Sequence, residues 1–283
     1  MSARGSCLLF ALTTILISSA SVGDPKPSEV APRPPKADRD MQEVLDVYEA
    51  LGAKPFETLP PELARRQPTL PDAVEVVLTR QLQAEPAVEP VAKIVNRTYG
   101  PHEIPLRIYT PKEGIRPYSV ILYFHGGGWV IGDLDLYDAT PRALANATGA
   151  IVVSASYRQA PEHKFPAAHE DAFDAYRWVL EHARSFGGNP RRVAVAGESA
   201  GGNLAINVAI RARDEKLTAP RHMLLVYPIA GANMATPSYV RNANAKPLGK
   251  AGMAWFFKYV FADPAQVKDP RIDLVSRKDL AGL

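Results

Sequence analysis

The sequence predicts an α/β fold, with a mainly parallel sheet covered by helices on both faces. The first observation is an alternation of strand-like and helix-like segments that begins near residue 120. The expected strands are Val120–Phe124, Ala150–Ala155, Arg192–Ala196 and Met223–Tyr227, and the expected helices are Thr140–Ala147, Ala167–Phe186 and Ala200–Arg213. This alternation is typical of parallel sheets with helices on both faces. The second observation is the composition. The chain has 283 residues, of which 46% are hydrophobic and 22% charged, and this is ample for a sizeable core.

The segments before residue 120 predict a different organisation. Asp40–Leu51 and Leu70–Leu82 have helical spacing, so residues 39–90 are expected to form a separate helical layer. Two further strands, Ala92–Tyr99 and Ile104–Tyr109, are expected to pair as an antiparallel hairpin, because Gly100 and Pro101 separate them.

After the last expected strand the regular pattern stops. Residues 231–250 are expected to be loop-like. The aromatic segment Met253–Phe261 is expected to be a helix, either in the core or as a lid over a pocket. The core is therefore taken as residues 91–283, with residues 231–268 as a cap or lid insertion.

The amino terminus is typical of a secretory signal peptide. Arg4 precedes the uncharged stretch Cys7–Ile17, and small residues follow up to Gly23. The stretch is too short for a stable membrane span. Residues 1–23 are thus expected to be cleaved after Ala20 or Gly23, giving a secreted or periplasmic protein without a stable membrane anchor. A buried helix or a residual anchor is the alternative. Residues 24–38, rich in Pro and charge, are expected to be a flexible tether.

Composition argues against several function classes. The net charge is +3 and no basic stripe runs along the sequence, so nucleic acid is not expected as a partner. The only cysteine is Cys7, within the predicted signal peptide. Cleavage would therefore exclude disulfides, thiolate catalysis and cysteine-based zinc sites.

The strongest chemical signal is Gly197-Glu198-Ser199-Ala200-Gly201, between an expected strand and an expected helix. In this context Gly-X-Ser-X-Gly predicts a sharp turn that presents a nucleophilic serine, here Ser199. Glycines at both ends allow neighbouring backbone to come close, where a Cβ atom would clash. The following helix start favours developing negative charge.

The second signal is His125-Gly126-Gly127-Gly128-Trp129, directly after the strand Val120–Phe124. Consecutive glycines expose backbone N–H groups that can stabilise the oxyanion of a tetrahedral intermediate. A flexible loop or a phosphate cradle is the alternative. Nucleotide binding is disfavoured, because neither Gly-Lys-Ser/Thr nor Gly-X-Gly-X-X-Gly is present there.

These two motifs, together with Tyr157-Arg158-Gln159-Ala160-Pro161-Glu162, resemble the hormone-sensitive-lipase-like family of α/β-hydrolases, which includes bacterial esterases and arylacetamide deacetylases. The resemblance runs from about Ile104 to the end of the sequence. It implies an α/β-hydrolase fold with residues 39–90 as a helical cap. It also implies a serine carboxylesterase that acts on short-chain or aryl esters through an acyl-enzyme, without metal or organic cofactor.

The resemblance also implies roles for single residues. Ser199 is the expected nucleophile. The expected oxyanion hole comprises Gly126, Gly127, Gly128 and Ala200, with Gly126 serving mainly the turn. His125 and Glu198 are expected to support the site, His125 by orienting the glycine loop. The family usually has Asp where Glu198 stands.

One part of the family pattern has no counterpart in this sequence. The acid and base of the family follow the serine on the seventh and eighth strands, and no matching segments are present. His222 is a poor base, because it starts a strand at the opposite edge of the sheet. His163 and His169 precede Ser199 and are expected to be structural or solvated. The expected fold thus lacks its last two strands, which leaves Met223–Tyr227 as an unpaired hydrophobic edge and the 283-residue chain with little activity.

Two other functions stay open at this point. One is an inactive, truncated hydrolase that acts at most as a binding protein. The other is an amidase or peptidase on the same scaffold.

Overall fold

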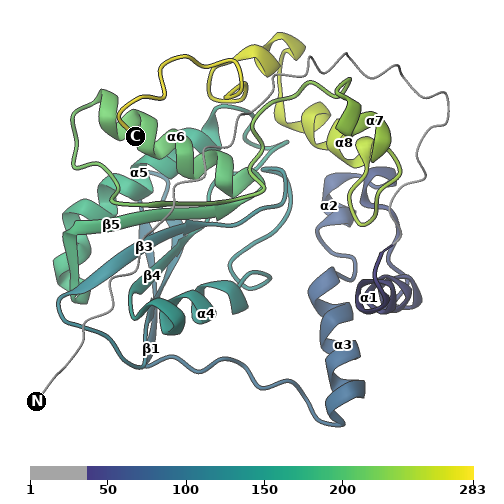
Figure 1. Cartoon of the computed structure of the whole chain (residues 1–283), viewed down its shortest axis with the longest axis horizontal. Helices are drawn as coiled ribbons and strands as arrows, with labels where there is room; N and C mark the ends of the chain where they lie inside the picture. Colours follow the sequence, from purple (N-terminus) through teal and green to yellow (C-terminus); the bar gives the residue numbers. More distant parts are fainter. Residues whose placement is uncertain (1–36) are drawn as a thin grey trace, which may run out of the picture. The chain divides into compact units, whose positions relative to one another are not determined.

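A computed structural model describes residues 37–283 of the protein (Figure 1). The predicted signal peptide, residues 1–23, lies outside the described residues, and so does the predicted tether except for residues 37 and 38. Both assignments stay predictions. Among residues 37–283, no helix has the length and apolar character that a bilayer crossing requires.

The described part of the chain contains a six-stranded sheet in the order β1-β2-β4-β3-β5-β6. β1 and β2 form the predicted antiparallel hairpin, and β2 is also antiparallel to β4. β4, β3, β5 and β6 run parallel to one another, as predicted. The strands are β1 (Lys93–Tyr99), β2 (Ile104–Thr110), β3 (Tyr118–Phe124), β4 (Ile151–Ala155), β5 (Gly188–Glu198) and β6 (Met223–Val226).

Helices cover both faces of this sheet (Figure 1). The helices α5 (Ala167–His182) and α6 (Ala200–Asp214) pack on one face, and α4 (Ala139–Thr148) packs on the other. Neighbouring strand residues point to opposite faces. Val153 and Val195 accordingly belong to the large core under α5 and α6, whereas Val152 and Ala196 belong to a smaller cluster with α4. The predicted mainly parallel sheet with helices on both faces is confirmed.

The first helices form a layer with its own small core. α1 (Arg39–Ala50) and α3 (Leu70–Leu82) pack through Val47, Ala73 and Val77. A short α2 (Pro61–Ala64) and the 3₁₀ turn η1 (Phe56–Thr58) connect them. Asp38 accepts a hydrogen bond from the Met41 N–H and is the N-cap of α1. Residue 38, the last residue of the predicted tether, is therefore the residue at which α1 begins.

The segment after β6 contains more helix than the sequence predicts. Residues 231–250 were expected to be loop-like, but α7 (Pro237–Arg241) lies among them. Its start has a recognisable cause, since Thr236 caps the Tyr239 N–H and proline occupies the first helical position. The aromatic helix is α8 (Lys250–Val260), and two further 3₁₀ turns are η2 (Ala183–Phe186) and η3 (Pro264–Lys268).

Within residues 37–283, β6 is an outermost strand and pairs only with β5. Leu224 and Val226 are 43% and 37% exposed, and Tyr227, just after the strand, is 74% exposed. In the described residues this strand is therefore the unpaired hydrophobic edge that the sequence predicts.

Candidate active site

The turn between β5 and α6 has the strained geometry of a nucleophile elbow. Ser199 has φ 54° and ψ −117°, a backbone conformation that non-glycine residues rarely adopt. A Cβ atom on Gly197 would collide with the backbone of Gly201, and one on Gly201 would collide with the carbonyl of Phe124. The two glycines are thus required by close backbone approach, which confirms the prediction from Gly-X-Ser-X-Gly.

Backbone hydrogen bonds hold the elbow in place. The Ser199 N–H donates to the Val226 carbonyl at 2.9 Å, and the Ser199 carbonyl accepts from the Ile229 N–H at 3.0 Å. Ala200 is the first residue of α6, so its N–H has no acceptor within the helix. The half-buried Ser199 side chain therefore sits at a helix start that favours negative charge.

The glycine loop after β3 is shaped by its positive φ values. Gly127 has φ 100° and Gly128 has φ 60°, and a Cβ on Gly128 would overlap the ring of Phe256 on α8. The Gly127 carbonyl accepts from the N–H groups of Val130 and Ile131, which closes the loop. Among the hydrogen bonds within residues 37–283, none uses the N–H of Gly127, Gly128 or Ala200. These three N–H groups therefore have no acceptor in the described part of the chain.

Glu198 joins the glycine loop to the elbow. Its Oε1 accepts from the Gly126 N–H at 2.7 Å and from the Tyr123 hydroxyl at 2.9 Å. Burial raises the pKa of this carboxyl, whereas the two donated hydrogen bonds favour its ionised form. Because its N–H is already donated to Glu198, Gly126 has no free donor in this structure, unlike Gly127 and Gly128.

His125 is locked into the base of the loop. Its Nδ1 lies 2.7 Å from the Gly126 carbonyl oxygen, and its ring is stacked between Tyr137 and Tyr157. Burial lowers the pKa of His125 to about 4, so the ring is neutral at pH 7 and Nδ1 is the protonated donor. Tyr157 in turn donates to the His125 carbonyl at 3.0 Å. His125 is thus placed to orient the glycine loop.

The remaining histidines do not reach Ser199. His169 on α5 is buried, and its Nε2 lies 2.8 Å from Oδ1 of Asn203, one turn after the elbow. Burial lowers the pKa of His169 to about 4. His163 is exposed, and His222 precedes β6 at the amino edge of the sheet. In the described part of the chain, no hydrogen bond joins the Ser199 hydroxyl to an imidazole.

Asp171, two residues beyond His169, is engaged elsewhere. The carboxylate is 1% exposed and accepts from both the backbone N–H and the guanidinium of Arg158, with a shortest distance of 2.7 Å. His169 and Asp171 are therefore present near the site, but they are bound to different partners and do not form a chain of hydrogen bonds to Ser199.

Sequence reasoning missed two contacts that position the loop. Arg65 in the helical layer donates to the Val130 and Ala160 carbonyls at 2.8 and 2.7 Å and forms an ion pair with Glu162 at 2.7 Å. Phe256 closes over Gly128 and packs against Phe56. Glu162 belongs to the segment Tyr157-Arg158-Gln159-Ala160-Pro161-Glu162, but no local sequence pattern indicates an ion-pair partner 97 residues away.

Comparison with known proteins places these features in a family. A family model described as alpha/beta hydrolase fold matches residues 121–283. Carboxylesterase NlhH of Mycobacterium tuberculosis is 43% identical over 197 residues, covering 66% of this chain and 62% of that protein. Arylacetamide deacetylase of Oryctolagus cuniculus is 34% identical over 192 residues, covering 65% of this chain and 48% of that protein. The chain thus spans about half to three-fifths of the length of these relatives.

Solved structures agree in fold. LAE6, an alpha/beta hydrolase enzyme from the metagenome of Lake Arreo, superposes with a TM-score of 0.74 at 34% identity. The match covers 87% of this chain and 75% of that structure. These matches agree with the elbow, the glycine loop and the sheet order described above. The protein belongs to the hormone-sensitive-lipase-like family of α/β-hydrolases.

Proposed function

We propose that the protein is a serine carboxylesterase for small esters, with Ser199 as the nucleophile. The observation that carries the proposal is the juxtaposition of a strained serine elbow with three unpaired N–H donors. The names of the relatives, carboxylesterase and arylacetamide deacetylase, point to the same acyl-transfer chemistry.

In the proposed reaction the Ser199 hydroxyl oxygen attacks the ester carbonyl carbon and loses its proton to solvent water, which returns a proton to the departing alkoxide. The carbonyl oxygen becomes an oxyanion, which accepts hydrogen bonds from the N–H groups of Gly127, Gly128 and Ala200. Collapse of this intermediate breaks the ester bond and releases the protonated alcohol. Water then hydrolyses the acyl-serine to a carboxylic acid and regenerates Ser199.

The supporting groups have separate tasks in this proposal. Glu198 and His125 act as positioning residues, because each holds a backbone group of Gly126 at 2.7 Å. Gly126 therefore anchors the loop and leaves donation to Gly127 and Gly128. The apolar side chains of α8, which lie against the loop at Phe256, would contact the acyl group.

We also propose that the 283-residue chain by itself turns esters over slowly. The support is the engagement of His169, whose Nε2 binds Asn203 and not Ser199. An unassisted serine hydroxyl is a weak nucleophile, although an oxyanion site alone retains about 10³ to 10⁴ of acceleration over water.

The test is hydrolysis of p-nitrophenyl acetate by the full chain and by Ser199→Ala. Ser154→Ala is the matched control, because Ser154 is a buried serine on β4 whose hydroxyl has no partner. We expect Ser199→Ala to hydrolyse the ester more slowly than the parent, at no more than the residual rate that the oxyanion site alone provides, and Ser154→Ala to retain the parental rate. Equal rates in Ser199→Ala and the parent would contradict the assignment.

The relative named arylacetamide deacetylase favours one second candidate, amide hydrolysis by the same serine. Parallel assays with p-nitroacetanilide distinguish the two. Amide turnover as fast as ester turnover would favour the amidase.

A further inference from the structure

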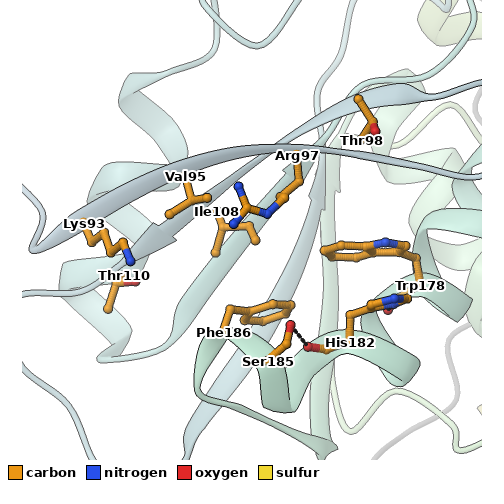
Figure 2. A pocket seen from close by; sticks show the side chains of 10 residues that line it. All are labelled: Lys93, Val95, Arg97, Thr98, Ile108, Thr110, Trp178, His182, Ser185 and Phe186. Atoms are coloured by element: carbon orange, nitrogen blue, oxygen red, sulfur yellow. Dashed lines mark hydrogen bonds between the residues drawn. The ribbon is translucent and has the colours of Figure 1, made fainter.

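A cavity of about 350 Å³ lies between the β1–β2 hairpin and the end of α5 with η2 (Figure 2). This volume falls within the range of about 300–1,000 Å³ that small-molecule sites occupy. The cavity is separate from the candidate active site, because η2 leads into the start of β5 whereas Ser199 follows its end. It is lined by Lys93, Val95, Arg97, Thr98, Ile108, Thr110, Trp178, His182, Ser185 and Phe186.

One wall of the cavity carries two cations. Lys93, Val95 and Arg97 alternate along β1, so their side chains share one face of the strand. The register pairs Lys93 with Thr110 and Val95 with Ile108, which extends this face across β2. Within residues 37–283, no carboxylate forms an ion pair with either cation. The positive charge of this wall is therefore uncompensated.

The opposite wall is a row of flat rings. Trp178, His182 and Phe186 follow one another at intervals of four residues at the end of α5 and in η2. The Trp178 and His182 rings are 4.7 Å apart at 13°, and the Trp178 and Phe186 rings are 5.9 Å apart at 12°. His182 Nδ1 lies 2.9 Å from the Trp178 carbonyl, which fixes the orientation of the imidazole. Figure 2 shows these rings opposite Arg97.

We propose that this cavity binds a small planar aromatic carboxylate. A flat ligand would stack on an outer face of the ring stack that Trp178 forms with His182 and Phe186. The Arg97 guanidinium presents paired N–H donors that match the two oxygens of a carboxylate, and Lys93 adds a second positive charge. The lining contains no acidic side chain that would repel such an anion.

The experiment is a titration of the full chain with benzoate, followed by tryptophan fluorescence. Benzamide serves as the neutral ligand of the same shape. We expect saturable binding of benzoate, about tenfold weaker binding of benzamide, and weakening of benzoate binding by added salt. Trp178→Phe should remove the signal, since the other two tryptophans, Trp129 and Trp255, lie outside the cavity.

Variants test the charged wall. Arg97→Gln should weaken benzoate binding by about tenfold. Arg177→Gln is the matched control, because it removes a cation from α5 outside the cavity, and it should bind as the parent does. The proposal is overturned if benzamide binds as tightly as benzoate, if Arg97→Gln binds as the parent does, or if the signal persists in Trp178→Phe. Tighter binding of adenosine monophosphate than of benzoate would overturn it in favour of a nucleotide site.

Discussion

Two regions beside the start of α6 contain reactive types of side chain, yet only one is organised for chemistry. At the elbow, Ser199 is half-buried and strained in its backbone, and it is followed by Ala200, whose N–H has no acceptor. Between α5 and α6, His169 is buried, neutral and hydrogen-bonded to Asn203. Asn203 and the neighbouring Asn207 each donate to the Arg271 carbonyl, so this second region ties the C-terminal segment to the sheet.

The difference shows what makes a side chain functional in this fold. Close backbone approach through glycine exposes donors and a hydroxyl at the elbow. Dense side-chain packing around His169 instead directs its Nε2 to Asn203, leaves its Nδ1 without a partner and removes water, which lowers the pKa of the imidazole. Single substitutions can perturb each region separately.

After the loss of the Ser199 hydroxyl itself, the largest effect is expected from Gly128→Ala. The new Cβ would collide with Phe256 and force an unfavourable backbone at φ 60°, displacing an oxyanion donor. Acylation by p-nitrophenyl acetate should slow by about tenfold or more, and stability should fall by about 1–3 kcal/mol. Stopped-flow release of p-nitrophenol and urea unfolding measure the two effects.

Gly52→Ala separates collision from backbone strain. Gly52 also has positive φ, at 84°, but nothing lies within 4 Å of the position of a Cβ there. Gly52→Ala should lose about 1 kcal/mol of stability and no acylation rate. If both variants acylated equally fast, the glycine loop would have no role in the reaction.

A smaller effect is expected at Glu198. Glu198→Ala removes the acceptor for the Gly126 N–H and the Tyr123 hydroxyl, and should slow acylation by roughly tenfold. Glu198→Gln keeps one oxygen acceptor and should stay within about threefold of the parent. A Gln variant as slow as the Ala variant would indicate that the negative charge itself is needed.

The smallest effect on activity is expected at His169. His169→Gln retains an N–H donor for Asn203, so acylation should not change. The effect of His169→Gln is expected in the stability of the protein at acid pH. The folded-state pKa of His169 is about 4, below the ordinary 6.5. The stability that depends on a neutral His169 is therefore fully present above pH 6.5 and is lost as the pH falls toward 4.

His169→Gln should therefore lose less stability than the parent between pH 7 and pH 4.5, by roughly 2–3 kcal/mol in urea unfolding. His125 has a similarly lowered pKa and keeps part of the acid sensitivity in the variant. The exposed His102→Gln is the control and should leave the pH dependence unchanged. An identical pH dependence in His169→Gln and the parent would show that this imidazole does not resist protonation.

The sequence predicted the elements with strong local signals. The sequence predicted β3, β5 and α6, because glycine motifs at strand ends and long apolar runs directly indicate the backbone conformation. The roles of Gly197 and Gly201 could be predicted because only glycine permits that approach. The short helices α2 and α7 were missed, since four or five residues carry too little periodicity.

Contacts between distant segments could not be predicted either. The Arg65–Glu162 ion pair and the Phe256–Gly128 packing depend on how separate layers meet, and no local pattern encodes that. The hydrogen bond between Glu198 and the Gly126 N–H could not be predicted either. The sequence indicated a supporting carboxylate, but only the structure shows that it occupies the donor of the first loop glycine.

The most direct test is intact-mass detection of an acyl-enzyme after mixing the full chain with p-nitrophenyl acetate. Its good leaving group makes acylation less dependent on a base than deacylation by water, so acetyl-enzyme should accumulate. We expect one acetyl group, mapped to Ser199, in the parent and in His169→Gln at equal rates, and none in Ser199→Ala. Acetylation mapped to another residue, or its loss in His169→Gln, would show that Ser199 is not an independent nucleophile.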